Sequence, residues 1–213
     1  DYENWLIETI KLANLNNNLD WIIKVHPVNV WRSKMDNSPM EQLEKISVKE
    51  NIGTLPSHIR FLDADSDINT FSLFNVIDYG LTVRGTIGME LPCWGIPVIT
   101  AGTGRYSGNG FTIDPHDYES YKNTLLNIHK IPKLTKKEID LALKYYYAVL
   151  FGKQIEMKGF VMKNYPNNNP ILSMNTHLTK SFSFENNSEL DYVANWMTKD
   201  STSDLLSKEF LEC

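Results

Sequence analysis

The stretch from 80 to 112, GLTVRGTIGMELPCWGIPVITAGTGRYSGNGFT, constrains the fold more than any other part of the chain. An apolar run at 81–83 leads into the turn 84–86, and a short helical segment follows. A second apolar run at 96–99 ends in a loop, 100–110, that contains four glycines. This order predicts a βαβ unit, whose loops gather at the carboxyl ends of parallel strands, where open α/β sheets bind their ligands.

The turn that opens this helical segment carries groups that suit a phosphate. Backbone N–H groups at Gly85 and Thr86 would be unpaired at a helix N-terminus. Arg84 would add a planar guanidinium, and the Thr86 hydroxyl could cap the helix or bond a phosphate oxygen. Glu90 lies four residues after Thr86, where its carboxylate could accept hydrogen bonds from a ribose diol. The alternative is a plain strand–helix–strand core, with glycines for close packing and Glu90 as a solvated helix residue.

The glycine-rich loop offers a second cation. Arg105 and Tyr106 follow Gly104, and we expect them to close over a bound ligand, with the Tyr106 ring packed against it. Gly102, Gly104 and Gly108 would permit that motion. A surface loop that simply needs glycine turns is the alternative.

Ahead of this unit, the sequence predicts a helix over 2–15 and a buried parallel strand over 21–25. His26 follows the strand, where its ring could face a ligand, and Pro27 ends the strand. The alternative for His26 is a hydrogen bond to a neighbouring loop. Residues 28–37 are expected to form a loop, and Ser38-Pro39 to begin a helix that runs to about Glu50.

The remaining segments predict one large domain and an extension. A strand is expected at 59–62, a short helix at 69–75, a helix from 114 to about 129, and a capping box at 135–138 that opens a helix closed by Gly152. We therefore expect a Rossmann-like domain over 1–152. The C-terminal extension, 153–213, is expected to be irregular, with short helices near 188–199 and 203–211.

Composition excludes several classes of protein. The net charge of -5 equals the excess of seven acidic residues over two lysines in 185–213, so the preceding 184 residues are neutral and a nucleic-acid-binding surface is disfavoured. Cys93 and Cys213 have no metal-ligand spacing, which favours a reducing compartment and neither a disulfide framework nor a zinc site. The acidic loop 63–67 lacks the glycine and the distal glutamate of a calcium-binding loop. No apolar run reaches the roughly 18 residues of a membrane-spanning helix.

Three motifs together resemble the capsule polysaccharide biosynthesis proteins, bacterial GT-B-type glycosyltransferases that include the Kdo transferases of capsule export. They are KVHP at 24–27, TVRGTIGME at 82–90 and WGIPVI at 94–99. The resemblance covers about residues 1–150 and implies the carboxyl-terminal, donor-binding half of a GT-B fold: a Rossmann-like parallel sheet flanked by helices.

The resemblance also implies a function and a set of contacts. The chain would bind a sugar nucleotide, often a CMP-linked sugar in relatives, as the donor in capsular or cell-surface polysaccharide biosynthesis. His26 and Thr86 would contact the donor phosphate, and Glu90 the ribose. No metal and no further cofactor would be needed. The chain begins without methionine, so we expect a fragment that is inactive alone, whose missing N-terminal domain binds the glycan or glycolipid acceptor. A cytoplasmic location, peripheral to the inner membrane or a capsule-export complex, would follow.

Relatives often have Ser-Ser or Ser-Thr where this chain has Gly85-Thr86, and they usually continue a helix where this chain has Pro92. Because an interior proline costs a helix about 3 kcal/mol, we expect this helix to be short or kinked.

Two other functions fit the same layout. One is a sugar-nucleotide epimerase of the UDP-N-acetylglucosamine 2-epimerase type, which would release a sugar without an acceptor. The other is a non-catalytic nucleotide-binding scaffold in capsule assembly, with the acidic C-terminal segment as a docking element. A dinucleotide-binding fold is disfavoured because no Gly-x-Gly-x-x-Gly follows the first strand.

Overall fold

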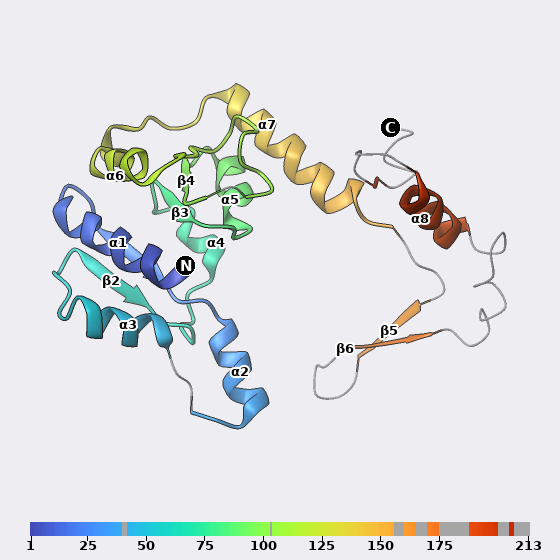
Figure 1. Cartoon of the computed structure of the whole chain (residues 1–213), viewed down its shortest axis with the longest axis horizontal. Helices are drawn as coiled ribbons and strands as arrows, with labels where there is room; N and C mark the ends of the chain where they lie inside the picture. The colour runs from blue at the N-terminus through green and yellow to red at the C-terminus, as the bar shows by residue number, and fades with distance from the viewer. Residues whose placement is uncertain are drawn as a thin grey trace. The chain divides into compact units, whose positions relative to one another are not determined.

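The computed structural model describes residues 1–39, 42–102, 104–155, 160–164, 170–174, 188–199 and 205–206. The chain divides into two compact units, Asp1–Tyr145 and Tyr146–Cys213, so that the division falls near the end of a helix (Figure 1). The boundary predicted from the sequence is at 152.

The first unit contains two pairs of parallel strands. β1 (Trp21–Lys24) pairs with β2 (Ile59–Leu62), and β3 (Gly80–Thr82) pairs with β4 (Val98–Thr100). The fold is therefore mixed α/β, mostly helical, with two small two-stranded parallel sheets. The continuous Rossmann-like sheet expected from the sequence is not seen, because no ladder of hydrogen bonds joins the two pairs within the described residues.

The strands at 59–62 and around 81 lie where the sequence predicts them, whereas β4 begins two residues later than expected. Pro97 explains the late start, because it has no N–H to donate to a ladder and is confined to the beginning of a strand. Its carbonyl does take part, since it accepts a hydrogen bond from the Gly80 N–H at 3.0 Å.

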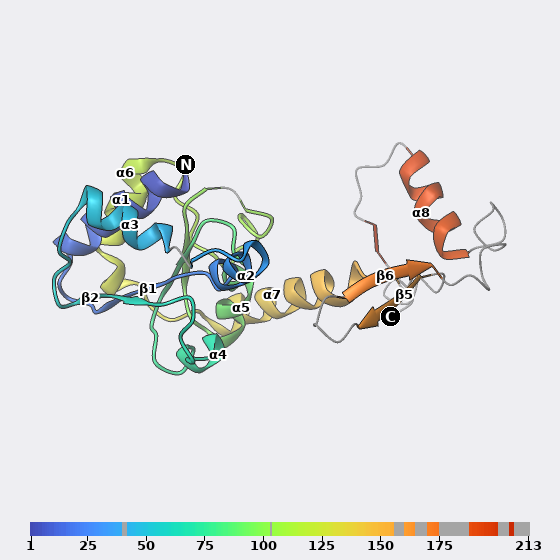
Figure 2. The ribbon, with the colours of Figure 1, turned by 90° about the horizontal axis from the view of Figure 1, so that it is seen from below.

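Helix α1 (Tyr2–Leu15) joins the two strand pairs through a shared core. It lies between α3 (Leu43–Asn51) and α6 (Tyr118–Leu126), as Figures 1 and 2 show. Ile7 and Ile10 pack in the cluster that contains Ile59 of β2, and Leu12 packs with Ile99 of β4. Trp21 of β1 packs against both clusters. One amphipathic helix thus covers both sheets.

The other elements connect or extend these layers. They are α2 (Val28–Asp36), α4 (Thr70–Leu73), α5 (Ile87–Glu90), the 3₁₀ turns η1 (Leu91–Trp94) and η2 (Ile128–Lys130), α7 (Lys136–Tyr147), the π-helical turn η3 (Ala148–Gly152), β5 (Phe160–Asn164), β6 (Pro170–Met174) and α8 (Ser188–Thr198). The predicted capping box of α7 is present, since Glu138 accepts hydrogen bonds from the Thr135 N–H and hydroxyl at 2.7 and 2.6 Å.

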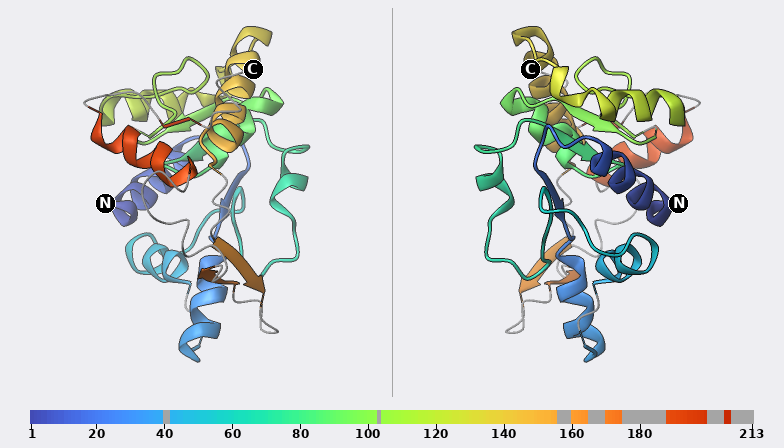
Figure 3. Two further views of the ribbon diagram at one scale, coloured as in Figure 1. Left: turned by 90° about the vertical axis from the view of Figure 1, so that its right-hand side faces the viewer. Right: turned by 90° about the vertical axis from the view of Figure 1, so that its left-hand side faces the viewer.

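The prediction of a loop at 28–37 is wrong, because these residues form α2, which extends away from α3 and α6 (Figure 3). The helix ends at Asn37, whose φ of 47° is left-handed. Ser38 then donates its N–H to the Ser33 carbonyl, and its own carbonyl accepts from the Ser33 hydroxyl. Ser38 therefore closes α2 instead of capping the next helix, and α3 begins only at Leu43.

The second unit also differs from the expected irregular segment. β5 and β6 form an antiparallel pair in which Phe160 lies opposite Met174. Five residues separate the two strands in the sequence, a usual length for a hairpin connection. Helix α8 confirms the helix predicted near 188–199. Of the helix predicted at 203–211, only 205 and 206 are described, and neither is helical.

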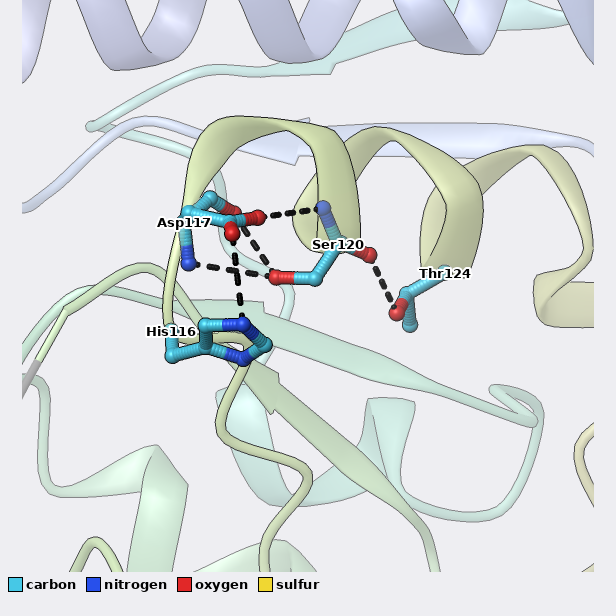
Figure 4. Close-up of polar contacts among 4 residues, drawn as sticks. All are labelled: His116, Asp117, Ser120 and Thr124. Atoms are coloured by element: carbon cyan, nitrogen blue, oxygen red, sulfur yellow. Dashed lines mark hydrogen bonds and ion pairs between the residues drawn. The ribbon is translucent and has the colours of Figure 1, made fainter.

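Helix α6 is capped at its start and bonded to α1. Asp117 accepts from the Ser120 N–H at 2.7 Å, and the Ser120 hydroxyl accepts from the Asp117 N–H at 3.1 Å (Figure 4). Further along, the buried Tyr121 hydroxyl accepts from Trp5 Nε1 at 2.9 Å and lies 2.9 Å from Thr9 Oγ1. The Thr9 hydroxyl donates to the Trp5 carbonyl, so Tyr121 is the donor to Thr9. The contact between α1 and α6 therefore includes a closed polar network.

We expect Tyr121→Phe to lower the free energy of unfolding by about 1–3 kcal/mol, because the half-buried Trp5 indole N–H would lose its acceptor and the buried Thr9 hydroxyl its donor. Tyr118→Phe is the matched control, since that hydroxyl is exposed and bonds Glu8, and it should cost less than about 1 kcal/mol. Urea denaturation of both variants measures the difference. Equal losses would contradict the role of the buried network.

Candidate functional site

The turn after β3 is built on Thr82. The Gly85 N–H donates to the Thr82 hydroxyl at 3.0 Å, and the chain then enters α5, where the Glu90 N–H donates to the Thr86 carbonyl at 3.1 Å. Thr86 and Glu90 are thus one turn apart, with Thr86 exposed and Glu90 half-buried. The turn lies at the carboxyl end of a parallel strand, as the sequence predicts.

Helix α5 is short, as the proline predicts. It has four residues and passes into the 3₁₀ turn η1, which contains Pro92 and ends at Gly95 with a φ of 77°. So short a helix sums few peptide dipoles, so it adds little to anion binding. Any affinity of the turn for phosphate must therefore come from individual donor groups.

Tyr106 is buried against this turn, with only 1% of its surface exposed. Its hydroxyl donates to the Gly85 carbonyl at 3.0 Å. Its ring covers Gly88 so closely that a Cβ at that position would lie 2.2 Å from the Tyr106 Cζ. Burial raises the pKa of Tyr106, so the phenol stays protonated and keeps donating. This geometry differs from the expected mobile ring, because Tyr106 faces the protein interior.

The glycine-rich loop is anchored at several further points. The Asp114 carboxylate accepts from the Gly108 N–H at 2.8 Å, from the Thr100 hydroxyl at 2.8 Å and from the Thr112 hydroxyl at 3.0 Å. The Tyr145 hydroxyl donates to the Arg105 carbonyl at 2.7 Å. These bonds join both ends of the loop to its middle, so its described residues from 104 onward are held in place and do not form the free segment that a closing lid requires.

Two exposed arginines flank this anchored region. Arg84 precedes Gly85, Arg105 precedes Tyr106, and both side chains are exposed. Across the part of the chain that the structure describes, neither arginine has an ion-pair partner. Their charges are therefore available to an anionic ligand. The Gly104 N–H is not available, because it donates to the Ser107 hydroxyl at 2.9 Å.

His26 lies at the carboxyl end of β1, as predicted, and is exposed. Its Nδ1 accepts the Val28 N–H at 3.0 Å. In the tautomer that accepts this bond the proton is on Nε2, for which no partner occurs among the residues that the structure describes. The exposed His26 ring can therefore accept the local hydrogen bond at Nδ1 and still donate from Nε2. Within the described ranges no hydrogen bond or ion pair joins His26 to Arg84, Thr86 or Glu90.

Of the predicted residues, the structure thus brings four into one contact network: Gly85, Gly104, Arg105 and Tyr106. Thr82, Gly88, Asp114 and Tyr145 complete that network and are missed by sequence reasoning. The aspartate directly after the loop is the signal that could have found Asp114, because Asp often accepts hydrogen bonds from nearby backbone N–H groups in loops. Thr82 bonds a neighbouring residue, Gly85, whereas Gly88 and Tyr145 give no local signal, since their partners Tyr106 and Arg105 are distant in the sequence.

A separate pocket of about 340 Å³ lies between α1 and α6, beside the start of the glycine-rich loop. Its walls include Trp5, Tyr118 and Gly102, and its carboxylates are Asp1, Glu8 and Asp117. At its edge His116 Nε2 lies 3.2 Å from Asp117 Oδ2 (Figure 4). Because three carboxylates would repel a phosphate, this pocket is electrostatically unlike the turn with Arg84.

Comparison with known proteins identifies no relative. No family model matches the sequence, and neither a curated protein nor a solved structure matches it. In the described residues, no group of three or more histidine, cysteine or acidic side chains could hold a metal, and no helix is long and apolar enough to cross a membrane. The function is therefore inferred from the chain's own residues.

The contact between Gly88 and Tyr106 can be tested by Gly88→Ala. Alanine normally stabilises a helix by up to about 1 kcal/mol relative to glycine. Here the added methyl group would displace the Tyr106 ring, so we expect a net loss of about 1–3 kcal/mol in the free energy of unfolding. Gly104→Ala is the control, because its Cβ would lie 3.4 Å from the same ring, an ordinary contact. A stabilised Gly88→Ala protein in urea denaturation would contradict the packing.

Proposed function

We propose that this chain binds a sugar nucleotide as the donor domain of a glycosyltransferase in capsular or cell-surface polysaccharide biosynthesis. The proposal depends on one observation: Arg84 and Arg105 are both exposed, and neither has an ion-pair partner among the described residues. Tyr106 links their two segments at the carboxyl end of a parallel strand pair. Open α/β sheets bind nucleotides at such edges, and guanidinium groups are well suited to phosphate oxygens.

The two strand pairs under α1 are consistent with one Rossmann-like half of a GT-B fold, and the motifs quoted above resemble those of capsule polysaccharide biosynthesis proteins. In this proposal, Arg84 and Arg105 neutralise the charge that develops on the nucleotide phosphate as it leaves, without a metal ion. Thr86 and the Nε2–H of His26 donate to phosphate oxygens, and Glu90 accepts from the ribose. The acceptor, a glycan or glycolipid, binds to another domain, in a protein located in the cytoplasm or peripherally at the inner membrane.

Calorimetric titration of the chain with CMP, UDP and GDP tests the proposal. We expect one of the three nucleotides to bind, and Arg84→Ala to weaken it by about tenfold or more, since a charge-assisted hydrogen bond is lost. Arg60→Ala is the matched control. Arg60 is also an exposed arginine, but it lies on β2, and its Nη2 is 3.8 Å from Asp20 Oδ1. Equal effects of the two substitutions, or no binding of any nucleotide, would contradict the proposal.

A further inference from the structure

A short segment after α6 concentrates positive charge at the surface. Residues 130–137, which we call the lysine segment, contain four lysines and no acidic residue. All four are exposed, and none has an ion-pair partner in the ranges of the chain that the structure describes: Lys130, Lys133, Lys136 and Lys137. Lys130 donates to Asn127 Oδ1 at 2.8 Å, a neutral acceptor. Because the whole chain carries a net charge of -5, the lysine segment is a positive patch on an acidic protein.

Three carboxylates lie near the lysine segment without neutralising it. Glu138 caps α7, and Asp140 follows it on the same helix. Asp78 precedes Tyr79, whose hydroxyl donates to the Ile131 carbonyl at 3.1 Å. Within the described residues, none of the three carboxylates forms an ion pair with a lysine of the segment. The four positive charges also outnumber these carboxylates, so they are available to an anionic partner.

A tryptophan lies beside the lysine segment. The Leu134 N–H donates to the Gly95 carbonyl at 3.1 Å, and Trp94 directly precedes Gly95. Ile139 of α7 packs at the same glycine, because a Cβ at Gly95 would lie 3.3 Å from Ile139 Cδ1. Lys136 is three residues before Ile139, so it lies on the same face of α7. The first turn of α7 and Trp94 are therefore neighbours.

The Trp94 side chain combines exposure with a fixed base. The residue is 61% exposed, and its ring meets the buried Phe74 ring edge-on, with centroids 5.8 Å apart. Tryptophan is enriched at membrane–water interfaces, where its amphipathic ring lies among the lipid headgroups. Lysines beside it would attract anionic headgroups and can lay their apolar stems along the membrane surface while their charged ends stay in water.

The type and the distribution of the cations favour a lipid surface over a nucleic acid. The lysine segment contains no arginine, whose planar guanidinium suits bidentate recognition of phosphates and bases. Proteins that bind a nucleic-acid strand extend positive charge along a groove that follows its backbone. In this chain the positive charge is concentrated in eight residues of an acidic protein.

We infer that the lysine segment and Trp94 form a docking surface for an anionic lipid bilayer. The lysines attract the negatively charged headgroups, and the indole enters the headgroup layer beside them. The inference assigns residues to the peripheral membrane location proposed above. Nucleotide binding is a separate proposal, and neither depends on the other.

The test is sedimentation of the chain with vesicles of phosphatidylcholine mixed with the anionic lipid phosphatidylglycerol, and with vesicles of phosphatidylcholine alone. The wild type should bind only the anionic vesicles. Changing Lys133 and Lys136 together to glutamine should weaken that binding by about tenfold or more, because each lysine near an anionic surface adds to the attraction. The matched control changes Lys34 and Lys49, exposed lysines of α2 and α3, to glutamine. It alters the net charge equally and should bind as the wild type does.

The indole is tested by Trp94→Ala, which should weaken binding to the anionic vesicles by about tenfold, since apolar surface no longer enters the headgroup layer. Trp31→Ala is the matched control, because Trp31 is 58% exposed but lies on α2, and it should leave the binding unchanged. Raising the salt concentration from about 0.1 M to about 1 M should weaken wild-type binding, because it screens the lysines.

Equal binding to the two kinds of vesicle, or equal effects of a variant and its control, would overturn the inference. Stronger binding to a single-stranded oligonucleotide, weakened by the same lysine substitutions, would also overturn it, because the lysines would then belong to a nucleic-acid site. The proposed function fails separately. If the chain binds anionic vesicles as described but calorimetry detects no nucleotide binding, the donor-domain proposal is wrong and the docking surface stands. If a nucleotide binds but the anionic vesicles do not, the reverse holds.

Discussion

The contact of Tyr106 with Gly85 and Gly88 is the constraint on which the candidate site depends. A buried phenol must find a hydrogen-bond partner, and the Gly85 carbonyl provides one at 3.0 Å. The ring can come this close only because Gly88 has no side chain. The glycine-rich loop and the turn after β3 are therefore joined through one residue, which lies directly after the exposed Arg105.

The turn and the glycine-rich loop differ in charge from the pocket between α1 and α6. Arg84 and Arg105 are exposed and unpaired within the described chain, whereas the pocket between α1 and α6 is rimmed by Asp1, Glu8 and Asp117. Its concave shape makes the pocket a candidate ligand site. Electrostatics favours the turn for an anionic ligand, because the carboxylates that line the pocket would repel an anion. Two of these carboxylates also have structural roles: Glu8 bonds Lys11 and Tyr118, and Asp117 caps α6.

The sequence predicts local features well and tertiary contacts poorly. Helix α1, strand β2, the Thr135–Glu138 capping box and the interruption of a helix at Pro92 all follow from short-range patterns, and all are present. The prediction of a loop at 28–37 is wrong, since these residues form α2. The helix ends at Asn37 through a left-handed backbone conformation, which asparagine permits but does not require. The burial of Tyr106 could not be predicted, since it depends on Gly88, 18 residues earlier in the sequence and on another element.

The proposed site can be tested by locating the residues that respond to a nucleotide. Backbone amide shifts across the ¹⁵N-labelled chain, recorded while UDP, CMP or GDP is added, would show which residues respond. We expect saturable shifts at Arg84, Gly85, Thr86 and Arg105, with smaller changes at Gly102 and Tyr118 in the acidic pocket. Shifts confined to that pocket, with the turn after β3 unchanged, would contradict the proposed site.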